Sequence, residues 1–422
     1  MENLVASKQL HPQVDAIVLD GAAIVQMLSP GRCTTFGDYA EQIFVPYVAS
    51  QLSHVSRLDL VWDQYATSSL KAATRAKRGI GIRRKVTTTG ELPRNWADFL
   101  RNDDNKTELF HFLSAHIVTT TVAGNKKLVV TDACHVLSCQ LEAELPDSAL
   151  DPCSHEEADT RMLLHAAHAA ANGHGRIMIK TVDTDVVVVA IACFERLRAS
   201  ELWIALGVGK NLRYIAVHEL VEVLGKDRCT ALPFFHAFTG CDTVSSFAGH
   251  GKKTGWETWN SFPDVTSTFS QLSSEPTDVE FAISLLQRFV VRMYERSSSK
   301  MTVNSLRKHL FTKKGKPMEG LPPTEAALLQ HTKRAVYQSG FCWFRSLQAE
   351  QNLPSPGEWG WLADDDCKWK PLWTDLPDVA KCLPELLKCG CKKGCSKRCR
   401  CLKANTRCTA LCACDGACHD DE

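Results

Sequence analysis

Nine cysteines between residues 389 and 418 constrain this 422-residue chain more than any other feature. Their spacing is C-x-C-x3-C-x3-C-x-C-x6-C-x3-C-x-C-x3-C, and thiolates at this density either form disulfides or bind metal. Zinc takes four tetrahedral ligands, so nine thiolates satisfy about three zinc ions if some of them bridge two ions. The predicted zinc ligands are Cys389, Cys391, Cys395, Cys399, Cys401, Cys408, Cys412, Cys414 and Cys418.

A disulfide-bonded knot in a secreted protein is the alternative to zinc binding, although an odd number of cysteines leaves one thiol over. The N-terminal sequence MENLVASKQLHPQVD is polar and unlike a signal peptide, and the other ten of the 19 cysteines are scattered singly. The longest apolar run, Val186–Phe194, is too short to span a membrane. We therefore expect a reducing compartment, metal-bound thiolates and no membrane partner.

Positive charge is concentrated in two segments, although the net charge is only +1. Residues 71–85, KAATRAKRGIGIRRK, contain seven Lys or Arg and no acid, and the cysteine-rich tail contains no acid before Asp415. Two basic segments together with a zinc module indicate nucleic acid as the partner, because Lys and Arg neutralise backbone phosphates. The tail residues expected to contact DNA are Lys392, Lys393, Lys397 and Arg398.

The tail, over about Cys389–Cys418, resembles the tesmin-type CXC zinc module, a DNA-binding unit of nuclear proteins. The chain has one copy where the family commonly has two, and Arg398 stands where the family has a DNA-contacting tyrosine just before the fourth cysteine. The resemblance implies nuclear localisation and zinc-dependent DNA binding. The loss of the tyrosine implies that the module grips mainly phosphates.

Strand-like and helix-like segments alternate through residues 15–240. Strands are expected at 15–20, 57–63, 126–130, 176–185, 202–206 and 212–216, with helices at 21–28, 106–119, 156–173, 217–224 and 230–240. This alternation predicts an α/β fold with a mostly parallel sheet flanked by helices. In such sheets the ligand site lies beyond the carboxyl ends of the strands.

Acidic residues are placed where that site should be. Four aspartates sit at or just past the end of an expected strand, two acids begin the helix at 156–173, and one lies in the turn of FTGCDTVSSFAGHG. Each alone is ordinarily a helix cap or a surface residue. Together they repel one another unless divalent cations neutralise them, and oxygen ligands suit Mg²⁺ or Mn²⁺. These acids are Asp20, Asp63, Glu157, Asp159, Asp183, Asp185 and Asp242.

The region from residue 15 to residue 259 resembles the flap-endonuclease/XPG branch of the PIN-like nuclease fold. The matching motifs are Asp20 in IVLDGAAIVQML, Asp63 in LDLVWDQYATSSLK, Glu157 and Asp159 in HEEADT, Asp183 and Asp185 in TVDTD, and Asp242 in TGCDTVSSFAGHG. The resemblance implies a helix-two-turn-helix element in which Gly249 and Gly251 form the hairpin. In the family this hairpin binds K⁺ and the backbone of duplex DNA.

The basic segment after Asp63 corresponds to the family's helical gateway, which contacts the scissile strand. The resemblance assigns Lys71 and Arg78 to the attacked phosphate, with Arg75 and Lys77 as close competitors for DNA contact. The chain also departs from the family, since it has a polar leader, lacks a terminal aromatic pair for clamp binding and matches poorly over residues 86–150. These departures favour a transposon-derived or lineage-expanded relative over a replication enzyme.

The function expected from these features is a nuclear, metal-dependent nuclease that cuts branched or flapped DNA. Two Mg²⁺ or Mn²⁺ ions about 4 Å apart would share the seven acids. One ion is expected to bind Asp183, Asp185 and Asp242, the other Asp63, Glu157 and Asp159, with Asp20 between them. Two alternatives stay open: a non-catalytic chromatin or transposon-derived DNA-binding protein on a nuclease scaffold, and an RNA-directed PIN nuclease.

The expected organisation is a leader (1–14), a nuclease domain (15–260), a helical and Trp-rich connector (261–380), the zinc module (381–418) and an acidic tail (419–422). In the connector, helices are expected at 277–294 and at 322–340, with Thr324 as the N-cap of the second. Its tryptophans suit core packing better than base stacking. Among the histidines, His155 is expected to be the only one near the acids.

Overall fold

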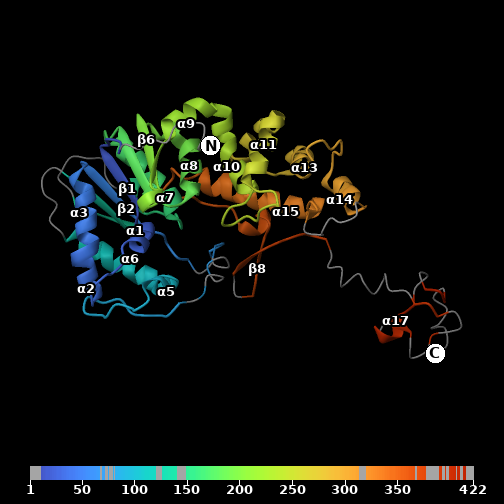
Figure 1. Ribbon diagram of the computed structural model, residues 1–422, viewed down its shortest axis with the longest axis horizontal. Helices are drawn as coiled ribbons and strands as arrows, with labels where there is room; N and C mark the ends of the chain where they lie inside the picture. The colour runs from blue at the N-terminus through green and yellow to red at the C-terminus, as the bar shows by residue number, and fades with distance from the viewer. Residues whose placement is uncertain are drawn as a thin grey trace. The chain divides into compact units, whose positions relative to one another are not determined.

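A computed structural model describes residues 11–66, 69–71, 75, 79, 81–119, 126–139, 149–312, 320–365, 368–376, 389–391, 395, 399–404, 406–408 and 412–414. Its centre is a seven-stranded sheet of order β4-β3-β2-β1-β5-β6-β7 (Figure 1). The strands are β1 (Ala16–Asp20), β2 (Arg57–Val61), β3 (Lys127–Asp132), β4 (His135–Cys139), β5 (Arg176–Thr181), β6 (Glu201–Leu206) and β7 (Arg213–Ala216). Neighbouring strands pair in parallel except at the two edges, where β4 and β7 are antiparallel. The predicted α/β class with a mostly parallel sheet is confirmed.

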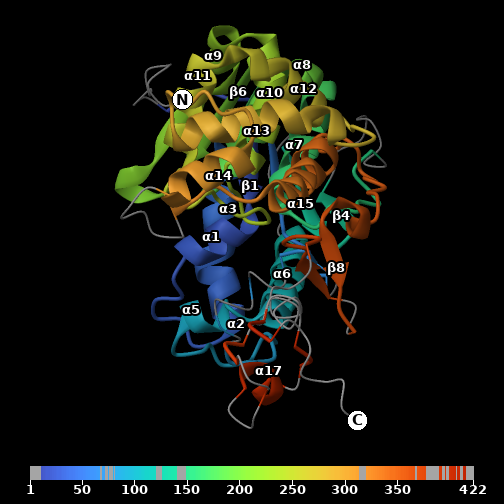
Figure 2. The ribbon, with the colours of Figure 1, turned by 90° about the vertical axis from the view of Figure 1, so that its right-hand side faces the viewer.

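Both faces of the sheet are covered by helices, and the strands alternate accordingly. In β1, Ala16 and Val18 belong to one hydrophobic core, whereas Ile17 and Leu19 belong to the other. The Ile17 face carries α1 (Gly21–Met27), α2 (Phe36–Tyr39), the π-helix η1 (Ala40–Phe44), α3 (Val45–Ser53), α5 (Trp96–Phe99) and α6 (Asp103–Val118). The Val18 face carries α7 (Ala158–Ala171), α8 (Thr184–Leu197), α9 (Val217–Leu224) and α10 (Lys226–Phe238) (Figures 1 and 2).

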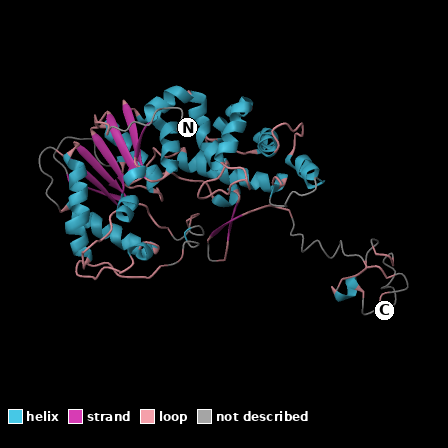
Figure 3. Cartoon of the chain, in the orientation of Figure 1, coloured by secondary structure: helices cyan, strands magenta, loops and turns pink. Residues whose placement is uncertain are grey.

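The segment after α10 is mostly helical and extends the Val18-face core. It comprises α11 (Lys252–Ser261), η4 (Pro263–Val265), α12 (Thr266–Leu272), α13 (Glu280–Tyr294), α14 (Val303–Thr312), α15 (Glu325–Val336), the π-helix η6 (Tyr337–Trp343), η7 (Pro356–Trp359) and the hairpin β8 (Trp361–Ala363) and β9 (Trp369–Pro371) (Figure 3). Thr324 caps α15 as predicted, accepting from the backbone N–H of Ala327 at 3.2 Å. Trp343 and Trp359 are buried in this core as expected, whereas Trp373 is 60% exposed.

Residues Met1–Trp373 form one compact unit and Thr374–Glu422 a second. The core of the first unit runs from β1 through α13 and α15, so it is continuous across residue 260. The domain boundary drawn there from the sequence stays a prediction. The second unit contains the short helix α17 (Arg400–Lys403) among its described residues. No described helix has both the length and the apolar character that a membrane span needs.

Candidate active site

Asp20 lies where β1 ends and α1 begins, beyond the carboxyl end of a central strand. Its carboxylate caps α1 by accepting from the N–H of Ala23 at 2.9 Å, and it accepts from the hydroxyl of Thr181 on the neighbouring strand at 2.9 Å. A Cβ on Gly21 would lie 2.2 Å from the ring of Trp62, so only glycine lets α1 start this close to β2. Burial and the negative charges of Asp63 and Asp183 raise the pKa of Asp20 to about 7.

Asp63 joins the end of β2 to the start of α7. Its carboxylate accepts from the N–H of Ala158 at 2.8 Å, so a residue outside α7 provides the acceptor that this N–H of the first turn lacks within the helix. Glu157, the residue at the N-cap position, makes no capping bond of its own, and Asp159 is buried in the first turn. Burial raises the pKa values of both Glu157 and Asp159. The negative charge of Asp183 raises the pKa of Asp159 further. The paired acids of HEEADT therefore face the same strand ends as Asp63.

Asp183 and Asp185 follow β5 and form the first turn of α8. Asp183 caps the helix by accepting from the N–H of Asp185 at 2.8 Å, and burial together with the charge of Asp185 raises the pKa of Asp183. Burial acts to raise the pKa of Asp185 as well, but a 2.8 Å hydrogen bond from His236, together with the charges of His236, Lys71 and Lys252, outweighs burial and lowers that pKa. His236 lies on α10 and is 5% exposed.

His236 corrects one expectation from the sequence. His155 was expected to be the only histidine near the acids, but its Nε2 donates to the carbonyl of Gln348 at 2.6 Å, and burial lowers its pKa to about 4. His236 instead holds Asp185 directly. No local pattern marked His236, because its contact with α8 arises from how two distant helices pack.

Lys71 lies in the middle of the acids. Its Nζ is 3.0 Å from a carboxylate oxygen of Glu157 and 3.5 Å from one of Asp242, so those two oxygens are at most 6.5 Å apart. Burial acts to lower the pKa of Lys71, but the charges of Glu157, Asp159 and Asp242 outweigh it and raise the pKa well above its ordinary value. All seven predicted acids are thus linked through Lys71 or through one another.

The acids gather without forming a closed ion site. Within the described parts of the chain, only cysteines bring three or more ligand atoms within 4.8 Å of one another. The carboxylates are arranged around an ammonium group instead. Buried oxygen donors that already hold a positive charge are nevertheless the kind of donor set that Mg²⁺ or Mn²⁺ requires. The residues present therefore fit a divalent cation.

The structure describes only some of the other residues that were predicted to contact DNA. Arg75 pairs with Asp103 at 3.0 Å and with Glu156 at 3.2 Å, and no ion pair between it and the seven predicted acids is recorded among the described residues. Gly249 has a positive φ of 73° in the turn after α10, and Gly251 is the N-cap residue of α11. Lys77 and Arg78 lie outside the described residues. The roles of all five residues in DNA binding stay predictions, as does K⁺ at the hairpin.

The second unit contains a cluster of cysteines with the geometry for metal binding. Two groups of four sulfurs lie within 4.8 Å, and both include Cys389 and Cys408. The first group adds Cys395 and Cys399, and the second adds Cys401 and Cys412. Two thiolates are therefore common to both groups, and the bridging of zinc ions by thiolates stays a prediction. A hydrogen bond from the backbone N–H of Leu402 lowers the pKa of the Cys399 thiol to about 6, which favours the thiolate that binds metal.

The remaining members of the predicted zinc module are described only in part. Cys391 and Cys414 pack against the cluster. Cys418 lies outside the described residues, and so do the four tail residues predicted to contact DNA, which are Lys392, Lys393, Lys397 and Arg398.

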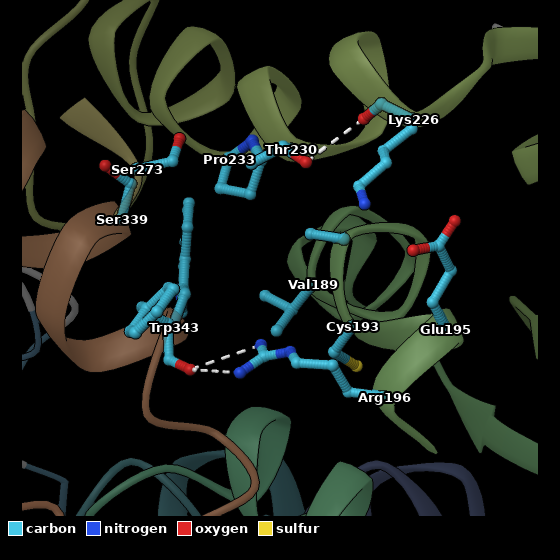
Figure 4. Close-up of a pocket in the computed structure, with 12 residues that line it drawn as sticks. Val189, Cys193, Glu195, Arg196, Lys226, Thr230, Pro233, Ser273, Ser339 and Trp343 are labelled. Atoms are coloured by element: carbon cyan, nitrogen blue, oxygen red, sulfur yellow. Dashed lines mark hydrogen bonds between the residues drawn. The ribbon is translucent and has the colours of Figure 1, made fainter. Parts of the chain in front are cut away.

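A separate cavity of about 280 Å³ lies between α8, α10 and η6 (Figure 4). Val189, Lys226 and Trp343 line it, and Arg196 closes one side while donating to the backbone carbonyl of Phe344. None of the acids around Lys71 lines this cavity. The acids at the strand ends therefore form a site that is distinct from this cavity.

These features define an α/β protein with clustered carboxylates at one sheet edge and a cysteine cluster in a second unit. No protein-family model matches the chain, and a comparison with curated proteins finds no match either.

Several solved structures are similar in shape. The T5 D15 protein co-crystallised with metal ions is 11% identical over 79% of this chain and 93% of that chain, with a TM-score of 0.38. The catalytic core of Rad2 in complex with DNA substrate is 14% identical over 75% of this chain and 94% of that chain, with a TM-score of 0.36. At these scores the likeness supports no functional conclusion, which must come from the chain's own residues.

Proposed function

We propose that the protein is a divalent-metal-dependent nuclease that hydrolyses phosphodiester bonds in branched or flapped DNA. The observation that carries this proposal is the gathering of seven acids from separate elements around Lys71 at the carboxyl ends of the strands. Buried acids that raise one another's pKa are costly to stability, so their retention favours a functional reason. The C-terminal cysteine cluster would bind zinc and add DNA affinity, in the nucleus.

The roles follow from where each carboxylate lies. Asp183, Asp185 and Asp242 would hold one divalent ion, and Asp63, Glu157 and Asp159 the other. Such ions supply Lewis acidity and a nucleophilic water at neutral pH. His236 orients Asp185 through its 2.8 Å hydrogen bond, and Asp20 adds negative charge behind both sets. Lys71 or Arg78 would donate hydrogen bonds to the phosphate as negative charge develops on it.

The test is cleavage of an end-labelled flap duplex by the full-length protein with Mg²⁺ or Mn²⁺. Asp183→Asn should reduce the rate about 100-fold or more, since it removes a carboxylate that would bind metal. Asp227→Asn is the matched control, because that aspartate is exposed at the opposite end of α10 from His236. An absence of cleavage by the wild type, or equal rates for Asp183→Asn and wild type, would refute the proposal. Single-stranded DNA, plain duplex and RNA substrates define the preferred nucleic acid.

A second candidate is a non-catalytic DNA-binding protein that uses the nuclease-like unit as a scaffold. It is favoured by the spacing of the carboxylates, because no three of those described lie within 4.8 Å of one another. Thermal unfolding separates the candidates. Millimolar Mn²⁺ should stabilise a metal-binding site by an amount that grows with ion concentration, whereas a scaffold should show no such effect.

A further inference from the structure

The ammonium group of Lys71 lies between the carboxylates, where a bound metal cation would be expected. Its side chain is only 14% exposed, and its Nζ makes one contact in each of the two acid groups that the proposed function assigns to metal. The 3.0 Å contact is with Glu157, from the group at the start of α7. The 3.5 Å contact is with Asp242, from the group that also includes the first turn of α8.

The same carboxylates cannot hold this ammonium group and a divalent ion together. Like charges at ion-pair distances repel strongly in a partly buried site. The open spacing of the carboxylates suits a single ammonium group at the end of a flexible side chain. A metal ion needs its oxygen ligands drawn closer, at about 2.0–2.2 Å from the ion. Metal binding and the observed Lys71 contacts are therefore alternatives.

We infer that the Lys71 ammonium is the resident cation of the acidic site, which divalent ions displace, and that displacement releases Lys71 to contact the DNA phosphate. This inference rests on the proposed function, because it concerns the same site. It adds an order of events: the lysine becomes available to the phosphate only after the metal has loaded. In the metal-free protein the Lys71 ammonium group then partly neutralises the acids.

The first test uses the wild-type protein without DNA. Brief acetylation with acetic anhydride, followed by peptide mass spectrometry, measures the reactivity of each lysine amine. Lys71 should react slowly in metal-free protein and at least about 10-fold faster with saturating Mn²⁺, because an ion-paired, protonated amine is a poor nucleophile. Lys180 is the internal control, since it is half-buried but bonds to Gln51 rather than to the acids. An unchanged Lys71 rate on Mn²⁺ addition overturns the inference.

The second test compares two charge-removing variants by Mn²⁺ titration calorimetry. Lys71→Met should raise Mn²⁺ affinity at least about 10-fold, because no amine has to be displaced. Lys252→Met removes a positive charge that also acts on Asp185, but Lys252 donates to the backbone carbonyls of His236 and Gly240. It should therefore change affinity much less. Equal effects of the two variants would mean that Lys71 acts only through long-range charge, and the displacement model would be rejected.

The two proposals fail separately. If Lys71 is released by Mn²⁺ but no DNA is cut, the displacement model stands and the nuclease function falls. If DNA is cut but the reactivity of Lys71 does not respond to Mn²⁺, the nuclease function stands and the displacement model falls.

Discussion

The buried carboxyl of Asp20 should make the metal-free protein less stable as the pH rises. Its pKa is about 7 in the folded protein and 3.8 for an ordinary aspartate, so between these values the folded state holds a proton that the unfolded chain releases. The free energy of unfolding therefore falls by about 1.4 kcal/mol per pH unit across this window, or about 4 kcal/mol in total, and the effect levels off above pH 7.

Asp20→Asn isolates this contribution. Asparagine stays neutral, and it can still accept from the N–H of Ala23 and donate to the hydroxyl of Thr181. At pH 4.5, which already lies above the ordinary aspartate pKa of 3.8, the variant should be more stable than the wild type by about 1 kcal/mol. At pH 8 the variant should be more stable by about 4 kcal/mol in buffers free of divalent ions.

Urea unfolding followed by circular dichroism between pH 4.5 and pH 8.5 measures the difference. Asp38→Asn is the control of opposite sign: hydrogen bonds from Thr34 and Thr35 lower the pKa of this exposed carboxyl to about 2. The stabilisation by Asp38 is complete above pH 4 and is lost only as the pH falls through 2, so its variant should show no drift over this range. If the gap between Asp20→Asn and wild type changes by less than about 1 kcal/mol, the buried-charge reasoning is wrong.

Three further changes test other parts of the structure. Cys389→Ser removes a thiolate common to both four-sulfur groups and should lower the zinc content by one to two ions per chain, measured by mass spectrometry; unchanged zinc would contradict the shared ligand. Arg57→Met leaves the fully buried Asp59 without its bidentate partner and should cost about 3–5 kcal/mol in urea unfolding, whereas a loss under 1 kcal/mol would show that water reaches the site. His236→Gln should weaken Mn²⁺ binding about 10–100-fold by calorimetry, and unaltered affinity would exclude a positioning role.

The strand ends were predictable from sequence because two signals coincide there. Short apolar runs such as AIVLD become buried strands, and an acid at the end of such a run then lies at the carboxyl edge of a parallel sheet. Asp20 and Asp183 illustrate this, since both also cap the helix that follows. The cysteine cluster was equally predictable from sequence, because closely spaced thiols either bind metal or form disulfides.

The features missed from the sequence all depend on packing between distant segments. Arg57, Asp59 and His165 form a buried network between β2 and α7, yet RLDLV looks locally like a half-exposed strand. The contact of His236 with α8 is of the same kind. Strand β4 was also missed, because it is a short segment, HVLSC, that a tight turn without Gly or Pro joins directly to β3. Spacing alone also could not show that the acids surround a lysine.

The strand order has a consequence for how the protein is made. Strand β1 pairs with β2 on one side and with β5 on the other, so one of its edges stays unpaired until residue 181 has been synthesised. Synthesis of residues 62–175 takes roughly 6–23 s at ordinary elongation rates. During this interval the nascent chain exposes the edge of an apolar strand that attracts other strands. Slower synthesis should therefore increase its dependence on chaperones that shield such edges.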